Sequence, residues 1–131
     1  MKVNSPLYNL ARFTSLIIEG IWQSLLIFEE QTMKKENRFQ SEVIKDLKKI
    51  FPDCVILKND PNYIQGFPDL TVFIGDKWAW LECKREKNAP HQPNQDGYIE
   101  RGNEMSFARF IYPENKMEVF DELQKAFRTG R

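Results

Sequence analysis

Apolar residues recur three or four positions apart at residues 35–51 and from 117 to 127, and this spacing predicts a helix in each of these segments. The clearest segment is residues 35–51, which Pro52 ends. A second helix is expected to begin at residues 93–95. A third is expected from Pro113, in its first turn, to about residue 127. The first and third of these helices are therefore predicted to bury one apolar side.

Four short runs rich in β-branched and aromatic residues predict strands, at residues 55–57, 70–74, 77–81 and 107–112. The order of elements is then helix, three strands, helix, strand and helix. Elements in that order favour an α/β fold, with a mixed central β-sheet of about four strands flanked by helices.

Gly75 and Asp76 separate the second run from the third, as the loop of a two-residue hairpin does. In that register Asp69 falls directly opposite Glu82, and Lys84 shares their face because side chains alternate along a strand. Two carboxylates and an ammonium must then pair, bind a cation or reach solvent, because burying unpartnered charges is costly. An ordinary salt-bridged strand end stays an alternative to a functional site.

The bulk composition changes this picture little. A chain of 131 residues is expected to form one domain, and its 19 basic and 19 acidic residues give no electrostatic argument for or against nucleic acid. Cys54 and Cys83 make no disulfide framework, and together with His91 they lack the spacing of zinc ligands. A reduced, cytosolic setting is therefore expected.

The first 32 residues differ in character from the rest. Residues 15–30 are expected to form a helix, but residues 13–28 are too short and too interrupted by polar side chains to span a bilayer, and no signal peptide is evident. Residues 33–37 resemble the beginning of a protein. One hypothesis therefore divides the chain into an N-terminal helical appendage, 1–32, and a functional domain, 33–131. The alternative is a helix that packs on the domain or on a second subunit, and both stay open.

An acid on the helix at 35–51 adds a third carboxylate. Glu36 lies near the centre of the apolar side, whereas Glu42 lies on its flank and Asp46 at its edge. Glu36 is thus expected to point toward the sheet, although a first-turn carboxylate is also favoured by the helix dipole alone. Whether Glu36 or Glu42 belongs with Asp69 stays open at this stage.

Two short motifs, Gly-Phe-Pro-Asp-Leu at residues 66–70 and Leu-Glu-Cys-Lys at residues 81–84, resemble the PD-(D/E)xK nuclease superfamily. The similarity is closest to its VRR-NUC branch, which includes small phage-encoded members. The pattern of that branch is a helical Glu, Gly-x-Pro-Asp, Glu-x-Lys and a Gln on a following helix. The chain matches this pattern in order with Glu36, Asp69, Glu82, Lys84 and Gln95. The resemblance covers about residues 33–127 and implies a restriction-endonuclease-like core.

The resemblance also implies a metal site. Asp69 and Glu82 would hold Mg²⁺ or Mn²⁺, hard cations that prefer oxygen ligands. The backbone carbonyl of Cys83 would be a further ligand, and Glu36 would bind a second ion or a water on the metal. Such a cation polarises the scissile phosphate and lowers the pKa of the attacking water.

The same resemblance gives roles to neighbouring polar residues. Lys84 would orient the attacking water or stabilise charge on phosphorus, and Gln95 would hold Lys84 or a phosphate oxygen. Candidate contacts to nucleic acid are Lys58, Tyr63, Arg85 and Lys87. For the three basic residues a solvated loop is the alternative, and for the tyrosine it is simple filling of a turn.

Taken together, these expectations describe a metal-dependent DNA endonuclease, either selective for branched DNA or nonspecific, in the cytoplasm of a bacterial or phage-infected cell. Its partner would be DNA rather than a membrane, and a homodimer is a further expectation because cutting two strands often needs two active sites. One alternative is a nucleic-acid-binding module that keeps the nuclease fold without cutting. Another is a small interaction protein whose acids are merely salt-bridged.

Overall fold

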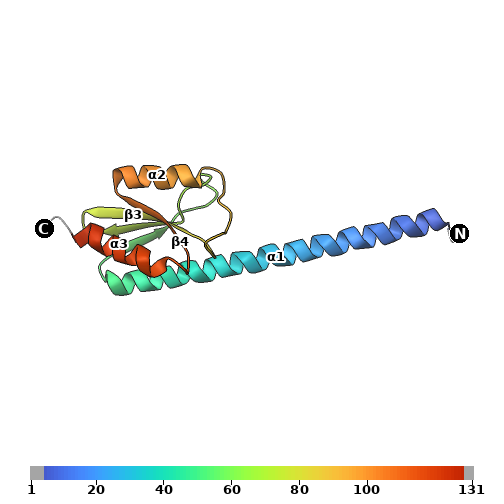
Figure 1. Cartoon of the computed structure of the whole chain (residues 1–131), viewed down its shortest axis with the longest axis horizontal. Helices are drawn as coiled ribbons and strands as arrows, with labels where there is room; N and C mark the ends of the chain where they lie inside the picture. The colour runs from blue at the N-terminus through green and yellow to red at the C-terminus, as the bar shows by residue number, and fades with distance from the viewer. Residues whose placement is uncertain (1–4, 129–131) are drawn as a thin grey trace. The chain divides into compact units, whose positions relative to one another are not determined.

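The computed structural model describes residues 5–128, and Figure 1 shows its elements. In chain order they are α1 (Pro6–Ile50), β1 (Val55–Lys58), β2 (Leu70–Ile74), β3 (Lys77–Cys83), α2 (Gln95–Met105), β4 (Phe107–Ile111) and α3 (Lys116–Arg128). The chain divides into two compact units, one ending at Lys34 and the other beginning at Lys35. Helix α1 contributes residues to both units.

The second unit contains one four-stranded sheet in the order β1-β2-β3-β4. The first three strands are antiparallel neighbours, whereas β3 and β4 run parallel. A parallel pair needs a crossover connection, and α2 supplies it. The predicted α/β fold with a mixed sheet of four strands is therefore confirmed.

The β2–β3 hairpin has the predicted register, with Ile74 opposite Lys77 and Leu70 opposite Leu81. Gly75 has a φ of 62°, whereas the φ of Asp76 is not positive. In a type II′ turn only the first of the two central residues has a positive φ, and this position favours glycine. The two-residue loop thus sets the pairing of the whole hairpin.

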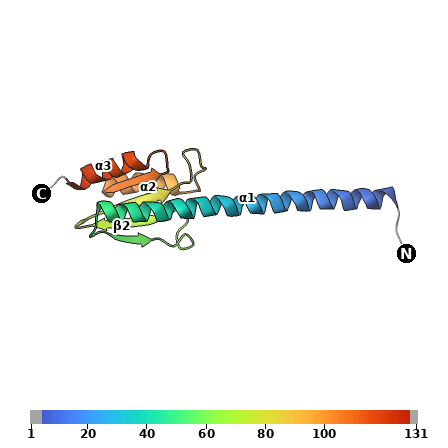
Figure 2. The ribbon, with the colours of Figure 1, turned by 90° about the horizontal axis from the view of Figure 1, so that it is seen from below.

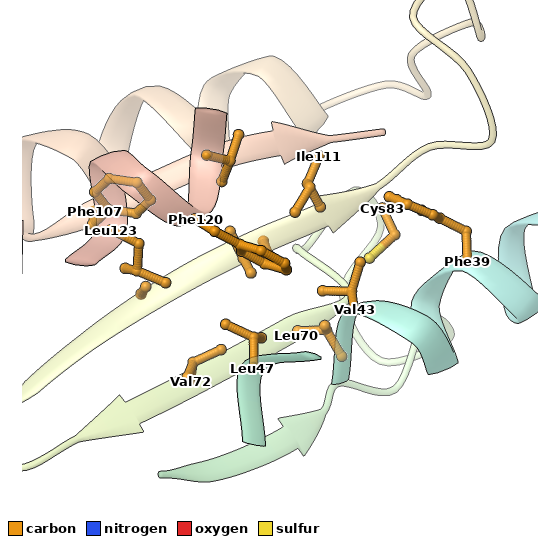
Figure 3. Packing of buried hydrophobic residues seen from close by; sticks show 13 residues of the cluster. Phe39, Val43, Leu47, Leu70, Val72, Cys83, Phe107, Ile111, Phe120 and Leu123 are labelled. Atoms are coloured by element: carbon orange, nitrogen blue, oxygen red, sulfur yellow. The ribbon is translucent and has the colours of Figure 1, made fainter. Parts of the chain in front are cut away.

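Helices cover both faces of the sheet. Figures 1 and 2 show the part of α1 from residue 35 onward and α3 on one face, and α2 on the other. The first face holds the hydrophobic core, drawn in Figure 3. Its buried residues are Phe39, Val43, Leu47, Leu70, Val72, Ala79, Leu81, Cys83, Phe107, Ile111, Val119, Phe120 and Leu123.

The second face is packed closely by α2. A Cβ atom added at Gly102 would lie 2.5 Å from the Ala108 Cβ and 2.9 Å from the Trp80 ring. The Phe67 ring packs edge-on against Trp80, with ring centroids 4.9 Å apart. Only a glycine lets the helix approach the sheet this closely, so α2 is held at a defined distance from β3.

We expect Gly102→Ala to destabilise the protein by about 1–3 kcal/mol, because the new methyl group overpacks the contact with Trp80. The matched control is Gly97→Ala on the same helix, where an added Cβ meets nothing within 4 Å. That change is expected to stabilise by about 0.5–1 kcal/mol, since alanine favours the helix. Urea unfolding measures both, and equal effects of the two substitutions would contradict the packing.

Two predicted boundaries are wrong. Helix α1 is continuous from Pro6 to Ile50, rather than separate helices at 15–30 and 35–51, because no glycine or proline interrupts residues 21–51. Helix α3 begins at Lys116, so Pro113 lies in the preceding turn and not in its first turn. Asn115 sets that start: its side-chain oxygen accepts the Tyr112 N–H, and its carbonyl accepts the first helical N–H from Val119.

The first unit is the N-terminal part of α1, and its large apolar side chains are exposed. Contrary to the sequence-based expectation, an 18-residue window there, with mean hydropathy 1.3 and none of it buried, is apolar enough to cross a membrane by length and composition. Signal sequences and core helices meet the same criterion. The absence of a membrane partner therefore stays a prediction, as does the division at residue 32.

Candidate active site

Asp69 and Glu82 meet at one end of the β2–β3 hairpin. The Asp69 N–H donates to Glu82 Oε2 at 3.1 Å, and the Cys83 N–H donates to Asp69 Oδ2 at 2.9 Å. Each carboxylate thus accepts a hydrogen bond from the backbone at or next to the other acid. This is expected where Asp69 lies opposite Glu82. The reciprocal hydrogen bonds hold two acidic side chains within one small region.

The turn that delivers Asp69 is fixed by its contact with the start of α2. Gly66 has a φ of 81°, and a Cβ there would lie 2.3 Å from the Pro93 carbonyl oxygen, so only glycine fits. Pro68 is fully buried, and its carbonyl accepts the Asn59 Nδ2–H at 2.8 Å. The Gly-Phe-Pro-Asp motif is therefore a rigid support that places the Asp69 carboxylate.

Lys84 follows β3 and is only 4% exposed. Its ammonium donates to Gln95 Oε1 at 2.8 Å and to the Pro90 carbonyl oxygen at 3.0 Å. Its backbone N–H donates to the Ile111 carbonyl at 2.8 Å, which anchors this residue to β4. Two of the three ammonium protons are thus bound by neutral oxygen atoms of Gln95 and Pro90.

Gln95, in the first turn of α2, links the lysine to the acids. Its Nε2 donates to Glu82 Oε1 at 2.7 Å, while its Oε1 accepts from Lys84 and also from the Gln92 N–H at 2.7 Å. Gln95 is itself 7% exposed, so this network is buried. The structure therefore brings together Asp69, Glu82, Lys84 and Gln95.

Burial and neighbouring negative charge make both acids harder to ionise than exposed carboxyl groups. Burial, with the neighbouring charge of Asp69, raises the pKa of Glu82 to about 8, and Lys84 only partly opposes this. Burial also raises the pKa of Asp69, to which the charge of Glu36 adds. A site in which both carboxyl groups are reluctant to ionise favours an added cation.

The structure separates the two candidate acids of α1. The negative charge of Glu36 contributes to the raised pKa of both Asp69 and Glu82, and its Oε1 lies 3.9 Å from an Arg85 nitrogen. Glu42 instead forms an ion pair with Lys116 at 2.7 Å. Glu36 is thus the helical acid on the side of the site.

The available donors fit a hard cation held partly by water. Within residues 5–128 no group of three or more His, Cys, Asp or Glu side chains is placed to hold a metal ion. The site offers the carboxylates of Asp69 and Glu82 and the backbone beside them at Cys83, which is an all-oxygen set. Magnesium commonly uses one or two carboxylates and keeps several waters, so this set suits Mg²⁺ or Mn²⁺.

The candidate nucleic-acid contacts fall into two groups. Lys58 and Lys87 are exposed, and Tyr63 is 83% exposed. Lys58 pairs with Leu70 in the β1–β2 ladder, so its backbone lies close to Asp69. Arg85 differs, because it is half-buried and forms ion pairs with Glu36 and Glu86.

One structural residue of the site escaped the sequence analysis. It is Asn59, directly after β1: its Nδ2 also donates to Thr71 Oγ1 at 2.9 Å, and its backbone N–H donates to the Asp69 carbonyl at 2.8 Å. The available signal was its position in the sequence, because Asn59 directly follows Lys58, which pairs with Leu70. A side-chain amide at that place can reach the Pro-Asp turn.

No family model, curated protein or solved structure matches this chain. Its class is therefore defined by the fold itself: an α/β protein with a long N-terminal helix, a mixed four-stranded sheet and two further helices. The chemistry must be inferred from the buried cluster at the end of the β2–β3 hairpin.

Proposed function

We propose that this protein is a metal-dependent DNA endonuclease with a restriction-endonuclease-like core, acting on branched DNA or without structural selectivity. The observation that carries the proposal is the buried network in which Gln95 joins the Lys84 ammonium to the Glu82 carboxylate, beside Asp69. An ordinary salt-bridged strand end would place the lysine against the acids directly. Here the lysine is held by neutral acceptors, which leaves the acids in need of a cation.

In this proposal Asp69 and Glu82 hold Mg²⁺ or Mn²⁺, with the Cys83 carbonyl as a further ligand. When bound, the cation polarises the scissile phosphate and lowers the pKa of the attacking water. The two carboxylates are pre-positioned by their backbone hydrogen bonds, so little reorganisation is needed on binding.

Lys84 acts on the same phosphate through its remaining ammonium proton. That proton would be donated to a non-bridging oxygen, where negative charge increases in the transition state, or to the attacking water. Gln95 and the Pro90 carbonyl fix the direction of the ammonium group. Gln95 is thus a positioning residue for the lysine, and exposed Lys58 and Lys87 would neutralise neighbouring phosphates.

The direct test is a cleavage panel with supercoiled, branched and single-stranded DNA, each with Mg²⁺, Mn²⁺ or EDTA. Cleavage that needs the metal and is lost in Lys84→Ala would support the proposal. DNA binding with no cleavage under any of these conditions would instead indicate a non-cleaving module. No binding of DNA or metal would favour a small interaction protein.

We expect Glu36→Gln to lower the cleavage rate by about 10–100-fold, because Glu36 supports the site from outside the two central carboxylates. The matched variant Glu42→Gln, on the same helix, removes an acid that pairs with Lys116 instead. Its cleavage rate should stay within about twofold of the wild type. The reverse order of effects in a steady-state assay would assign the helical acid to Glu42.

A further inference from the structure

A hollow of about 270 Å³ lies on α2 next to the candidate active site. It is lined by Asn94, Gly97, Tyr98 and Arg101. Asn94 directly precedes Gln95, the residue that joins the lysine to the acids. The hollow therefore lies within one helical turn of the proposed catalytic network.

The polar groups that line this hollow have no partner of their own. Across residues 5–128 there is no hydrogen bond or ion pair to the Asn94 side chain, the Tyr98 hydroxyl or the Arg101 guanidinium. An amide, a phenol and a guanidinium together offer several donors and two acceptors. They are available to a ligand that combines a flat apolar face with polar edges.

A second hollow, at the β4 edge, makes a useful contrast. It is larger, at about 480 Å³, but several of its polar side chains are bonded to other residues of the protein. Arg109 donates to Asn103 and pairs with Glu122, and His91 lies 2.7 Å from Asp96. The side chains of His91, Asn103, Arg109 and Asn115 are thus already bonded within the protein, so this hollow gives less reason to expect a ligand.

Tyr98 presents a rigid aromatic surface to the first hollow. Its ring packs edge-on against Phe67, with centroids 5.3 Å apart, and against Trp80 at 6.4 Å. The Arg101 guanidinium carbon lies 5.7 Å from the centre of the same ring. A fixed aromatic ring with an arginine beside it is a combination on which nucleic-acid bases stack.

Gly97 lines the hollow at a place where no other atom packs against it. An added Cβ would meet no atom within 4 Å, so packing does not require a glycine here. Glycine inside a helix lowers stability relative to alanine, and this position therefore carries a cost with no gain in packing. Space for a ligand would account for it.

The hollow and the acids belong to one rigid assembly. Phe67, which supports the Tyr98 ring, lies two residues before Asp69. Gly66 is so close to Asn94 that an added Cβ would lie 2.8 Å from the Asn94 Cβ. A group bound in the hollow would consequently have a fixed position relative to the carboxylates.

We infer that this hollow binds a nucleobase of the DNA strand whose phosphodiester lies at Asp69 and Glu82. The base would stack on Tyr98 and Arg101, and the Asn94 amide would donate to and accept from its edge. This inference rests on the proposed function, since it names the substrate group beside the scissile phosphate. It predicts that the protein reads bases as well as the sugar-phosphate backbone.

The test uses Gly97→Leu, which fills the hollow with a side chain that favours the helix. Binding is measured by fluorescence anisotropy in EDTA with two single-stranded oligonucleotides of equal length, one ordinary and one abasic. We expect the wild type to bind the ordinary strand at least about fivefold more tightly, and Gly97→Leu to bring this ratio close to one. Gly97→Ala, the matched control, should keep most of the preference, and Arg101→Gln should lower it independently.

Equal affinity of the wild type for both strands, binding to neither, or an unchanged ratio in Gly97→Leu would each overturn the inference. Thermal melting of every variant excludes misfolding as the cause of a changed ratio. Because the binding assay contains no metal, its result does not depend on cleavage. Absence of metal-dependent cleavage would refute the proposed function alone, whereas intact cleavage with an unchanged ratio would refute the base-binding hollow alone.

Discussion

Asp69→Asn is expected to lower metal-dependent DNA cleavage by about 10³-fold or more, because it removes a charged ligand from the proposed cation site. The same change should leave the protein as stable as the wild type, or more stable, in EDTA near pH 8. The reason is that the pKa of Asp69 is raised by burial, so an ionised Asp69 weakens the folded state. Loss of activity without loss of stability would indicate that Asp69 is a metal ligand and not an acid needed for folding.

The measurement for this prediction is the initial rate of plasmid nicking over a range of Mg²⁺ concentrations, together with the melting temperature in EDTA. Asp121→Asn serves as the matched control, since Asp121 is an exposed acid on α3 that pairs with Lys125. Its cleavage rate should equal that of the wild type. Robust cutting by Asp69→Asn would refute the site, and a large fall in its melting temperature would indicate a structural role.

The second large effect is expected in the pH dependence of stability of the metal-free protein. The Glu82 carboxyl has a pKa of about 8 in the folded protein, against its ordinary value of 4.5. Between these values the folded state holds a proton that the unfolded state has released. Stability must therefore fall as pH rises through this window, by at most about 1.4 kcal/mol per pH unit from this one group. The raised pKa of Asp69 acts in the same direction.

Melting in EDTA from pH 5 to pH 8.5 measures this effect, at roughly 4 °C per kcal/mol. Glu82→Gln cannot ionise, so its melting temperature should change less with pH and exceed that of the wild type at pH 8. Added Mg²⁺ should stabilise the wild type most at high pH, where a larger fraction of Glu82 is ionised, and have little effect on Glu82→Gln. A wild-type melting temperature that rises between pH 5 and pH 8 would contradict the charge balance described here.

Much of the site could be predicted because its central part is local. Asp69 and Glu82 are joined by a hairpin whose two-residue loop and alternating side chains set the register, and the observed ladder agrees. The glycine at residue 66 was quoted as part of a motif, but its role was not predicted. That role depends on a contact with Pro93, 27 positions later in the chain, which no local pattern reveals.

Helix boundaries were less predictable. Residues 33–37 resemble the beginning of a protein in composition, yet α1 passes through them without a break. Composition does not end a helix; a proline, a glycine or a cap does, and Pro52 is the first breaker after Gly20. The start of α3 was misplaced because the Asn115 carbonyl accepts the Val119 N–H, so the helix begins after Asn115 and not at Pro113.

The sequence by itself determined the α/β class, the four strands and the meeting of Asp69 with Glu82, because periodicity and a tight turn act over a few residues. Only the tertiary structure decided that Gln95 joins Lys84 to Glu82, since this requires α2 to pack on one particular face of the sheet. It also decided that Glu36 rather than Glu42 lies toward the acids. Contacts between distant segments depend on which face of the sheet each helix packs against. The pattern of residues along the chain does not specify this packing.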